Sequence, residues 1–230
     1  MISLEACNSK SNSYKNFRWK TLLNKKKTKA NSHHFFNISS KSTVTHIKFN
    51  IFPDGGVARL RLFGKISKDT INLKNKTTNL TSLLNGASVI ACNNEHFGKA
   101  ENILAPGKAK NMGDGWETRR RRKPGNDWGV LALSKPAQVE EIIVDTKFFK
   151  GNFPHKFSLS TANISDQEDA SIIESSKSWT KLLERKKLGM NQIHTFGMKD
   201  ILHNEPFTHV RVDIYPDGGI ARLKFIGKFI

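Results

Sequence analysis

Cysteine is scarce in this 230-residue chain, and long apolar runs are absent from its sequence. Cys7 and Cys92 are too few and too far apart for a disulfide framework or a cysteine metal site, so both are expected to be free thiols. No stretch near Met1 has the apolar core of a signal peptide, and no other stretch approaches the length of a membrane span. We therefore expect a cytoplasmic protein without a membrane partner.

Acidic residues are also few, because 20 of them stand against 38 lysines and arginines, for a formal net charge of +18. Such an excess is typical of proteins that bind nucleic acid or anionic membranes. The excess is uneven: residues 1–85 hold 16 basic and 3 acidic side chains (+13), and residues 86–230 hold 22 and 17 (+5). Residues 1–41 are rich in Lys, Asn and Ser with little apolar periodicity, so a disordered basic tail is expected there.

One pattern occurs twice in the chain. HIKFNIFPDGGVARLRLFGK at residues 46–65 aligns without gaps with HVRVDIYPDGGIARLKFIGK at residues 209–228. Each copy has alternating segments on both sides of Pro-Asp-Gly-Gly, which predicts a β-hairpin whose turn uses glycine for its positive φ values. The apolar positions of the second copy are predicted to be core: Val210, Val212, Ile214, Ile220, Leu223 and Phe225.

A repeat of this length indicates two homologous domains. Little sequence precedes the first copy, so residues 42–66 are expected to be the final hairpin of a first domain whose remainder is missing. Residues 67–84, rich in Lys, Asn and Thr, are expected to be a linker, and residues 85–230 a complete second domain. Short alternating segments separated by turn residues predict that this domain is all-β, a sandwich or jelly roll.

The segment with the densest chemistry is residues 98–128, GKAENILAPGKAKNMGDGWETRRRRKPGNDW. It is too polar and too rich in Gly and Asn to be one helix or strand, so it is interpreted as ordered loops that carry a site. Asp114, Glu117 and Asp127 alternate with four consecutive arginines, and Trp116 and Trp128 flank these charges.

This segment, with VDTKFFKGNFP at residues 144–154, closely resembles the allantoicases, which hydrolyse allantoate to ureidoglycolate and urea in purine breakdown. The resemblance covers about residues 85–230 and the hairpin at residues 42–66. It implies jelly-roll domains like the galactose-binding modules, a homo-oligomer, and allantoate as the small-molecule substrate. Allantoate itself comes from the resemblance and not from the chemistry of the residues.

Allantoate has a carboxylate and two ureido groups on one carbon, so its site needs a fixed cation and several hydrogen-bonding groups. Arginine suits the carboxylate because its planar fork binds two oxygens at once. If the four arginines are extended, alternate side chains face opposite sides. Either Arg119 and Arg121 or Arg120 and Arg122 then face the pocket, and we assign the first pair to the substrate.

Hydrolysis also needs a base for water and a proton for the leaving urea. Among the acids and histidines of these segments, which include His155, the expected catalytic residues are Asp114, Glu117, Glu95 and His96. The expected substrate-binding residues are Arg119, Arg121, Trp116, Asn126, Asp127, Asp145, Lys150 and Asn152. Asp54 and Asp217 of the two Pro-Asp-Gly-Gly turns are explained sufficiently by turn chemistry.

No metal or cofactor is expected, since the sequence has no pair of cysteines or histidines at ligand spacing. It also has no glycine-rich phosphate loop after a strand and no Gly-x-Ser-x-Gly elbow. Two alternatives stay open. A chain with a truncated first repeat could be an inactive remnant that serves as a small-molecule binding or interaction module. Nucleic-acid binding ranks third, because residues 86–230 carry only +5.

Overall fold

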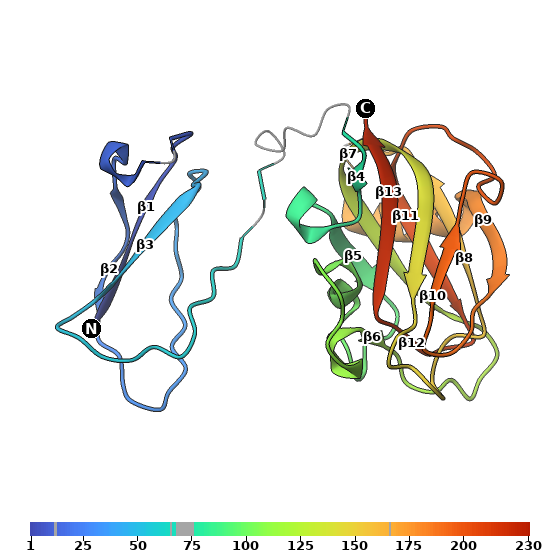
Figure 1. Ribbon diagram of the computed structural model, residues 1–230, viewed down its shortest axis with the longest axis horizontal. Coiled ribbons are helices and arrows are strands. Elements are labelled where there is room, and N and C mark those ends of the chain that lie inside the picture. The colour runs from blue at the N-terminus through green and yellow to red at the C-terminus, as the bar shows by residue number, and fades with distance from the viewer. Residues whose placement is uncertain (12, 65, 68–75, 166) are drawn as a thin grey trace. The chain divides into compact units, whose positions relative to one another are not determined.

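The computed structural model describes residues 1–11, 13–64, 66–67, 76–165 and 167–230. They fall into two units, Met1–Gly64 and Lys65–Ile230. Nearly all regular structure in both is β-strand, which confirms the predicted all-β class (Figure 1). None of the helices in the described residues has the length and hydropathy that a membrane span requires.

One long strand, β7 (Asp127–Asp145), organises the second unit (Figure 1). Its first part pairs antiparallel with β11 (Phe207–Tyr215) and β5 (Ser88–Cys92). Its second part pairs with β13 (Arg222–Phe229) and β10 (Ile193–Phe196). Because β7 changes partners along its length, it belongs to both layers of the β-sandwich that the sequence predicted.

Near Pro136, β7 passes from one layer to the other within a continuous strand. One layer has the order β9-β8-β11-β7-β5 and the other the order β4-β13-β7-β10. The remaining elements of this unit are β4 (Thr78–Asn79), β6 (Trp116–Glu117), β8 (Lys156–Ala162), β9 (Thr180–Lys187), β12 (Gly219–Ile220), α1 (Asp169–Ser175), and 3-10 turns at Leu83–Asn85, Ala100–Leu104, Met112–Asp114 and Ser176–Ser178.

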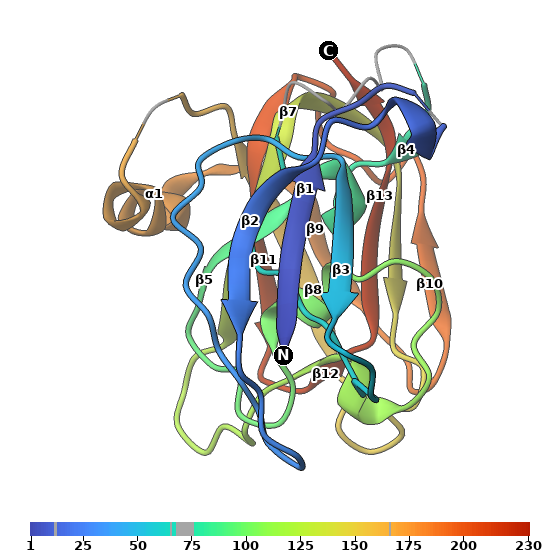
Figure 2. The ribbon, with the colours of Figure 1, turned by 90° about the vertical axis from the view of Figure 1, so that its left-hand side faces the viewer.

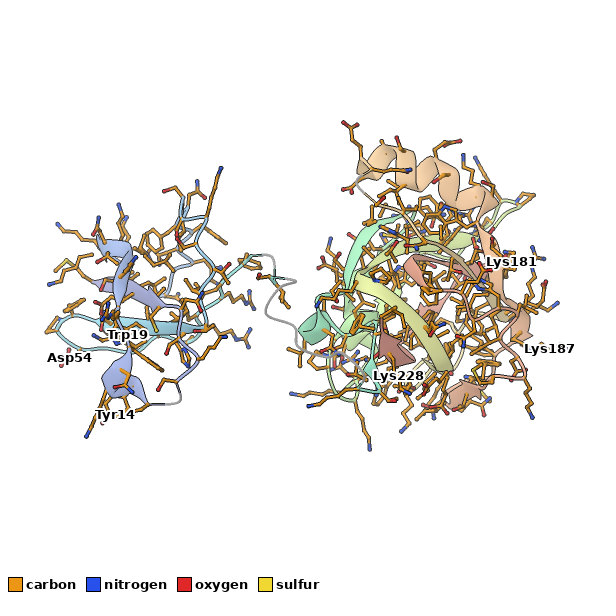
Figure 3. The ribbon with its side chains drawn as sticks, turned by 90° about the horizontal axis from the view of Figure 1, so that it is seen from above. Tyr14, Trp19, Asp54, Lys181, Lys187 and Lys228 are labelled. Carbon is orange, nitrogen blue, oxygen red and sulfur yellow. The ribbon has the colours of Figure 1, made fainter. Side chains whose placement is uncertain are left out.

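The core of the second unit lies where the apolar faces of its strands meet. All six positions predicted from the second hairpin copy are fully buried there, so the alternating pattern identified the inward face correctly. Burial of each such side chain contributes about 1.5–3 kcal/mol. Lys181 and Lys187 of β9 are exposed and point away from the sandwich (Figure 3).

The first unit is a small antiparallel sheet of β1 (Ile2–Cys7), β2 (Lys20–Lys26) and β3 (His46–Ile51), with a 3-10 turn at Tyr14–Asn16. The strands lie side by side in the order β2-β1-β3 (Figure 2). Its apolar cluster comprises Ile2, Leu4 and Leu23, with Leu22, Phe36, Ile38, Ile47 and Phe49 packed against them.

The expected disordered tail at residues 1–41 is therefore wrong for β1 and β2. In β1, Ile2, Leu4 and Ala6 alternate along one face and are buried, whereas the lysines of β2 remain exposed. The basic residues of β2 therefore lie on the solvent-exposed side of a sheet, not in a disordered tail. The alternation of Ile2, Leu4 and Ala6 is too short a pattern to predict a strand within a segment rich in Lys and Asn.

Two further expectations change in the structure. Of the hairpin expected at residues 42–66, β3 and the turn form, but residues 57–64 are in no strand. The linker expected at residues 67–84 includes residues 68–75, which lie outside the described part of the chain. Its later residues belong to the second unit, because β4 pairs with β13 and Leu80 is fully buried.

Candidate active site

A cavity of about 480 Å³ lies in the second unit, where three loops meet. Its lining consists of residues 117, 118, 120 and 121, residues 151–153 and 155, residues 216–218, and Phe97. The first loop precedes β7, the second follows β7, and the third is the Pro-Asp-Gly-Gly turn after β11. Segments far apart in the sequence therefore contribute to one cavity.

The Pro-Asp-Gly-Gly turn is hydrogen-bonded to both of the other loops. The backbone N–H of Thr118 donates to the Gly218 carbonyl at 3.2 Å, and the Gly218 N–H donates to Thr118 Oγ1 at 3.0 Å. The Gly219 N–H donates to the Asn152 carbonyl at 2.7 Å. Gly218 has a φ of +133°, and a Cβ there would lie 2.7 Å from that same carbonyl oxygen, so the position requires glycine.

Glu117 supplies a nearly buried carboxylate to the cavity wall, with 8% of its surface exposed. It ends β6, whose backbone pairs with β12, and Asn152 donates a side-chain hydrogen bond from Nδ2 to its Oε1. Because a carboxylate only accepts hydrogen bonds, Asn152 fixes one of its oxygens in direction. A carboxylate held in this way beside a cavity can accept a proton from water.

Arg121 supplies a cation to the same cavity and is held by two acids. Its Nη2 and Nε lie 2.6 Å and 3.2 Å from Asp127 Oδ1, and its backbone N–H donates to Asp217 Oδ2 at 2.8 Å. The Asp127 side chain is fully buried, whereas the Arg121 side chain is 25% exposed. With Arg120 also in the lining, the cavity can attract and orient a carboxylate.

The chain is similar to known proteins in both sequence and structure. The family model described as allantoicase repeat matches residues 1–67 and 78–230. A probable allantoicase 2 from Burkholderia mallei is 44% identical over 211 residues, which cover 91% of this chain and 62% of that protein. A probable allantoicase from Pseudomonas fluorescens is 45% identical over 228 residues, or 98% of this chain and 69% of that protein. The crystal structure of allantoicase from Saccharomyces cerevisiae matches with a TM-score of 0.76 and 31% identity, over 98% of this chain and 67% of that one.

The chain belongs to the allantoicase family. The resemblance inferred from the loop at residues 98–128 is thereby confirmed. The family match also begins at residue 1, so the segment expected to be a tail is part of the matched repeat, in agreement with the strands found there. The chain spans 62% of the length of the Burkholderia mallei relative and 69% of that from Pseudomonas fluorescens.

Three of the site residues predicted for this allantoicase-family chain line the cavity together: Glu117, Arg121 and Asn152. Asp127 does not line it but holds Arg121 from behind. The alternation assumed for the four arginines is not realised, because residues 118–126 form no strand, and Arg120 and Arg121 both line the cavity. Local extension was a premise that the folded loop does not meet.

Asp114, an expected catalytic residue, has a structural role. Its Oδ2 accepts from the Lys110 backbone N–H at 2.9 Å and lies 3.1 Å from Arg222 Nη2. The hydrogen bond from Lys110, followed by the one from Arg222, lowers the pKa of this carboxyl. Asp114 closes its own turn and neutralises a buried arginine, and it is outside the cavity lining.

Glu95 and His96, the other expected catalytic residues, also lie outside the lining. Glu95 accepts from Lys99 Nζ at 2.6 Å and from the Ala100 N–H at 3.2 Å, and the bond from Lys99 is the main cause of its lowered pKa. His96 Nδ1 lies 3.1 Å from Nη2 of Arg119, which was expected to bind substrate. These contacts order the loop ahead of the cavity.

The remaining predicted substrate ligands contact the protein itself or solvent. Trp116 is fully buried, and its Nε1–H donates to the Asn94 carbonyl at 2.8 Å. Asn126 donates from Nδ2 to Asp213 Oδ1 at 2.9 Å. The other two are away from the lining as well: Asp145 Oδ1 accepts from the Lys147 N–H at 2.8 Å, and Lys150 is exposed.

The cavity also contains residues that the predicted site omitted. Thr118 and Phe153 were not considered, and Asp217 was interpreted as a turn residue. The one available signal for Asp217 was the repeated Pro-Asp-Gly-Gly pattern, which indicated the turn but not its neighbours. Among the described residues, no group of three or more His, Cys, Asp and Glu side chains is placed to hold a metal ion.

Proposed function

We propose that this chain is an allantoicase, a hydrolase that converts allantoate and water to ureidoglycolate and urea in purine breakdown. Family membership supports the reaction, and the convergence of Glu117, Arg121 and Asn152 on one cavity supports the location. The relatives named probable allantoicase extend beyond the matched segment, so activity of this chain by itself is part of the proposal.

In the proposed reaction, the guanidinium of Arg121 binds the carboxylate of allantoate and orients the substrate. Glu117 removes a proton from water, and the water oxygen bonds to the carbon that carries both ureido groups. The bond from that carbon to one ureido nitrogen breaks, and urea leaves after its nitrogen gains a proton. The cavity-lining His155 is the candidate donor of that proton.

A urea-release assay with allantoate tests this proposal. Glu117→Gln keeps the shape and can still contact Asn152 but cannot accept the proton, so kcat is expected to fall by about 10²- to 10⁴-fold. Glu140→Gln is the matched control, because Glu140 is exposed on β7 and lies 3.4 Å from Lys228. The control is expected to retain the parent rate.

A folded parent that releases no urea would overturn the enzymatic proposal. Calorimetric titration with allantoate would then test the alternative, in which the cavity binds a small molecule without turnover. Parent-like activity in Glu117→Gln would place the base elsewhere.

We further propose that the protein is a cytoplasmic homo-oligomer, as the family resemblance implies. Sedimentation velocity of the purified chain checks the oligomeric state, and a single monomeric species across a hundredfold range of concentration would contradict it.

A further inference from the structure

The buried carboxylate of Asp127 is only half satisfied. Its Oδ1 accepts from Arg121 Nε and Nη2 and from Asn93 Nδ2, the last at 3.1 Å. Its Oδ2 is buried and has no hydrogen-bond partner in the described residues. Buried polar atoms are nearly always paired, so an orphaned carboxylate oxygen reduces stability and indicates a role other than stabilisation.

The guanidinium of Arg121 has an unused side. An arginine has five N–H donors, and the bonds to Asp127 occupy Nε and Nη2. Nη1 has no hydrogen-bond partner in the part of the chain that the structure describes, although Arg121 lines the cavity. Gly125 lies beside Nη1 without crowding it, because even a Cβ at Gly125 would be in ordinary van der Waals contact with Nη1, at 3.4 Å. The fork is therefore anchored on one side and unoccupied on the other.

We propose that Asp127 is a positioning residue that holds Arg121 so that its unused side binds the carboxylate of the substrate. That the substrate is allantoate rests on the proposed function. That Arg121 binds the carboxylate of a ligand does not rest on it. Asp127 itself is fully buried, so it acts through Arg121 rather than by contact with the substrate. Asp217 fixes the backbone of Arg121, and Asp127 fixes its side chain.

Removal of the Asp127 charge has a specific consequence in this cavity. A guanidinium without its buried partner is attracted to the nearest remaining acid. The cavity offers Glu117 and Asp217, so a released Arg121 would pair with one of them. Either ion pair would move the Arg121 guanidinium away from the substrate carboxylate. A pair with Glu117 would also occupy the carboxylate that is proposed to act as the base.

Asp213→Asn is the matched control for Asp127→Asn. Asp213 is 5% exposed and accepts from Arg211 Nε at 3.1 Å and 3.2 Å, so it too is a buried acid paired with an arginine. Neither member of this pair lines the cavity. Both substitutions break a buried ion pair and reduce stability, but only Asp127→Asn releases a cavity arginine.

The first measurement is the Nε–H signal of Arg121 in proton–nitrogen correlation spectra of the full chain, assigned through its loss in Arg121→Lys. We expect a slowly exchanging signal in the parent and in Asp213→Asn, and a faster exchange in folded Asp127→Asn, because a neutral amide oxygen accepts more weakly than a carboxylate. Equally slow exchange in Asp127→Asn would overturn the anchoring role of the Asp127 charge.

The second measurement is a titration with acetate, followed through the same signal. The parent is expected to show a saturable shift, and Asp127→Asn is expected to bind acetate at least about tenfold more weakly. No shift in the parent would overturn the inference even if the chain releases urea. A shift in a parent that releases no urea would leave the inference intact and overturn the proposed function.

If the parent does release urea, the same pair of variants separates positioning from stability. Asp127→Asn is expected to raise the KM for allantoate by about tenfold to a hundredfold with a smaller effect on kcat, since a charge-assisted hydrogen bond to the ground state is lost. Asp127→Glu, which restores the carboxylate, is expected to recover part of this loss. An equal rise of KM in Asp213→Asn would overturn the positioning role.

Discussion

The two copies of the hairpin form the same turn but differ after it. Gly55 and Gly218 have φ values of +132° and +133°, so the turn geometry is reproduced. Asp54, in the turn of the first unit, points into solvent (Figure 3). After the second turn, β13 forms and Leu223 is fully buried; after the first, residues 57–64 form no strand and the equivalent Leu60 is 44% exposed.

The difference follows from what surrounds each copy. The sheet order β2-β1-β3 of the first unit corresponds to β9-β8-β11 of the second, and β3 is equivalent to β11 in the repeat. In the second unit, β7 lies between β11 and β13. The described residues of the first unit contain no counterpart of β7. A turn is therefore encoded locally, whereas a strand also requires a neighbour to pair with.

The largest expected difference between the copies comes from their equivalent leucines. Leu223→Ala removes a fully buried side chain and should lower the unfolding free energy of the second unit by about 2–5 kcal/mol. Leu60→Ala removes a half-exposed one and should change stability by at most about 0.5 kcal/mol. Denaturant unfolding followed by tryptophan fluorescence and circular dichroism measures both. Equal effects would contradict the unpaired state of residues 57–64.

Substitution of the two turn glycines, Gly55 and Gly218, should show a smaller difference in unfolding free energy. Alanine is strained at the positive φ of both Gly55 and Gly218, at about 1–3 kcal/mol each. A Cβ at Gly218 would also meet the Asn152 carbonyl at 2.7 Å, whereas a Cβ at Gly55 meets nothing within 4 Å. We therefore expect Gly218→Ala to be the more destabilising by roughly 1 kcal/mol and to impair urea release, because it displaces Asn152. A Gly55→Ala variant with the larger unfolding defect would contradict this difference.

The same comparison explains which parts of the molecule the sequence could predict. The core face of the second hairpin was predictable because alternation is a local property, and Val212 and Leu223 are both buried as expected. The residues of the site were harder to predict from the sequence. Asp217 meets Arg121 across 96 residues of sequence, a contact created by the pairing of distant strands. Trp116 was assigned to substrate although it is fully buried, because composition alone does not distinguish a ligand contact from core packing.

The loop arginines show the limit of a periodicity rule. Alternation would have separated Arg120 from Arg121, but the irregular path of the loop places both in the cavity. Glu117 and Asn152 were identified because the resemblance covered their segments. Their mutual hydrogen bond and the contact of Gly219 with Asn152 both join residues far apart in the sequence, which no local pattern encodes.

The smallest expected difference in stability comes from the equivalent arginines of the two copies, Arg59 and Arg222, and this difference depends on pH. Arg222 lies 3.1 Å from Asp114 Oδ2, whereas Arg59 has no ion pair within the described residues. Hydrogen bonds from Lys110 and Arg222 lower the pKa of Asp114 from its usual 3.8. Its contribution to stability is therefore present above the usual pKa and is lost as the pH falls through the lowered one.

Asp114→Asn should consequently lower the free energy of unfolding near neutral pH. On acidification, the free energy of unfolding of this variant should fall by less than that of the parent. Because the Asp114 side chain is 39% exposed, the difference should stay below about 1 kcal/mol. Unfolding midpoints measured from pH 7 to below pH 3 would check this, with Arg59→Gln as the matched change in the first unit. Parent and Asp114→Asn curves that remain parallel over this range would show that the ion pair contributes nothing, and the arginines of the two copies would then differ only in burial.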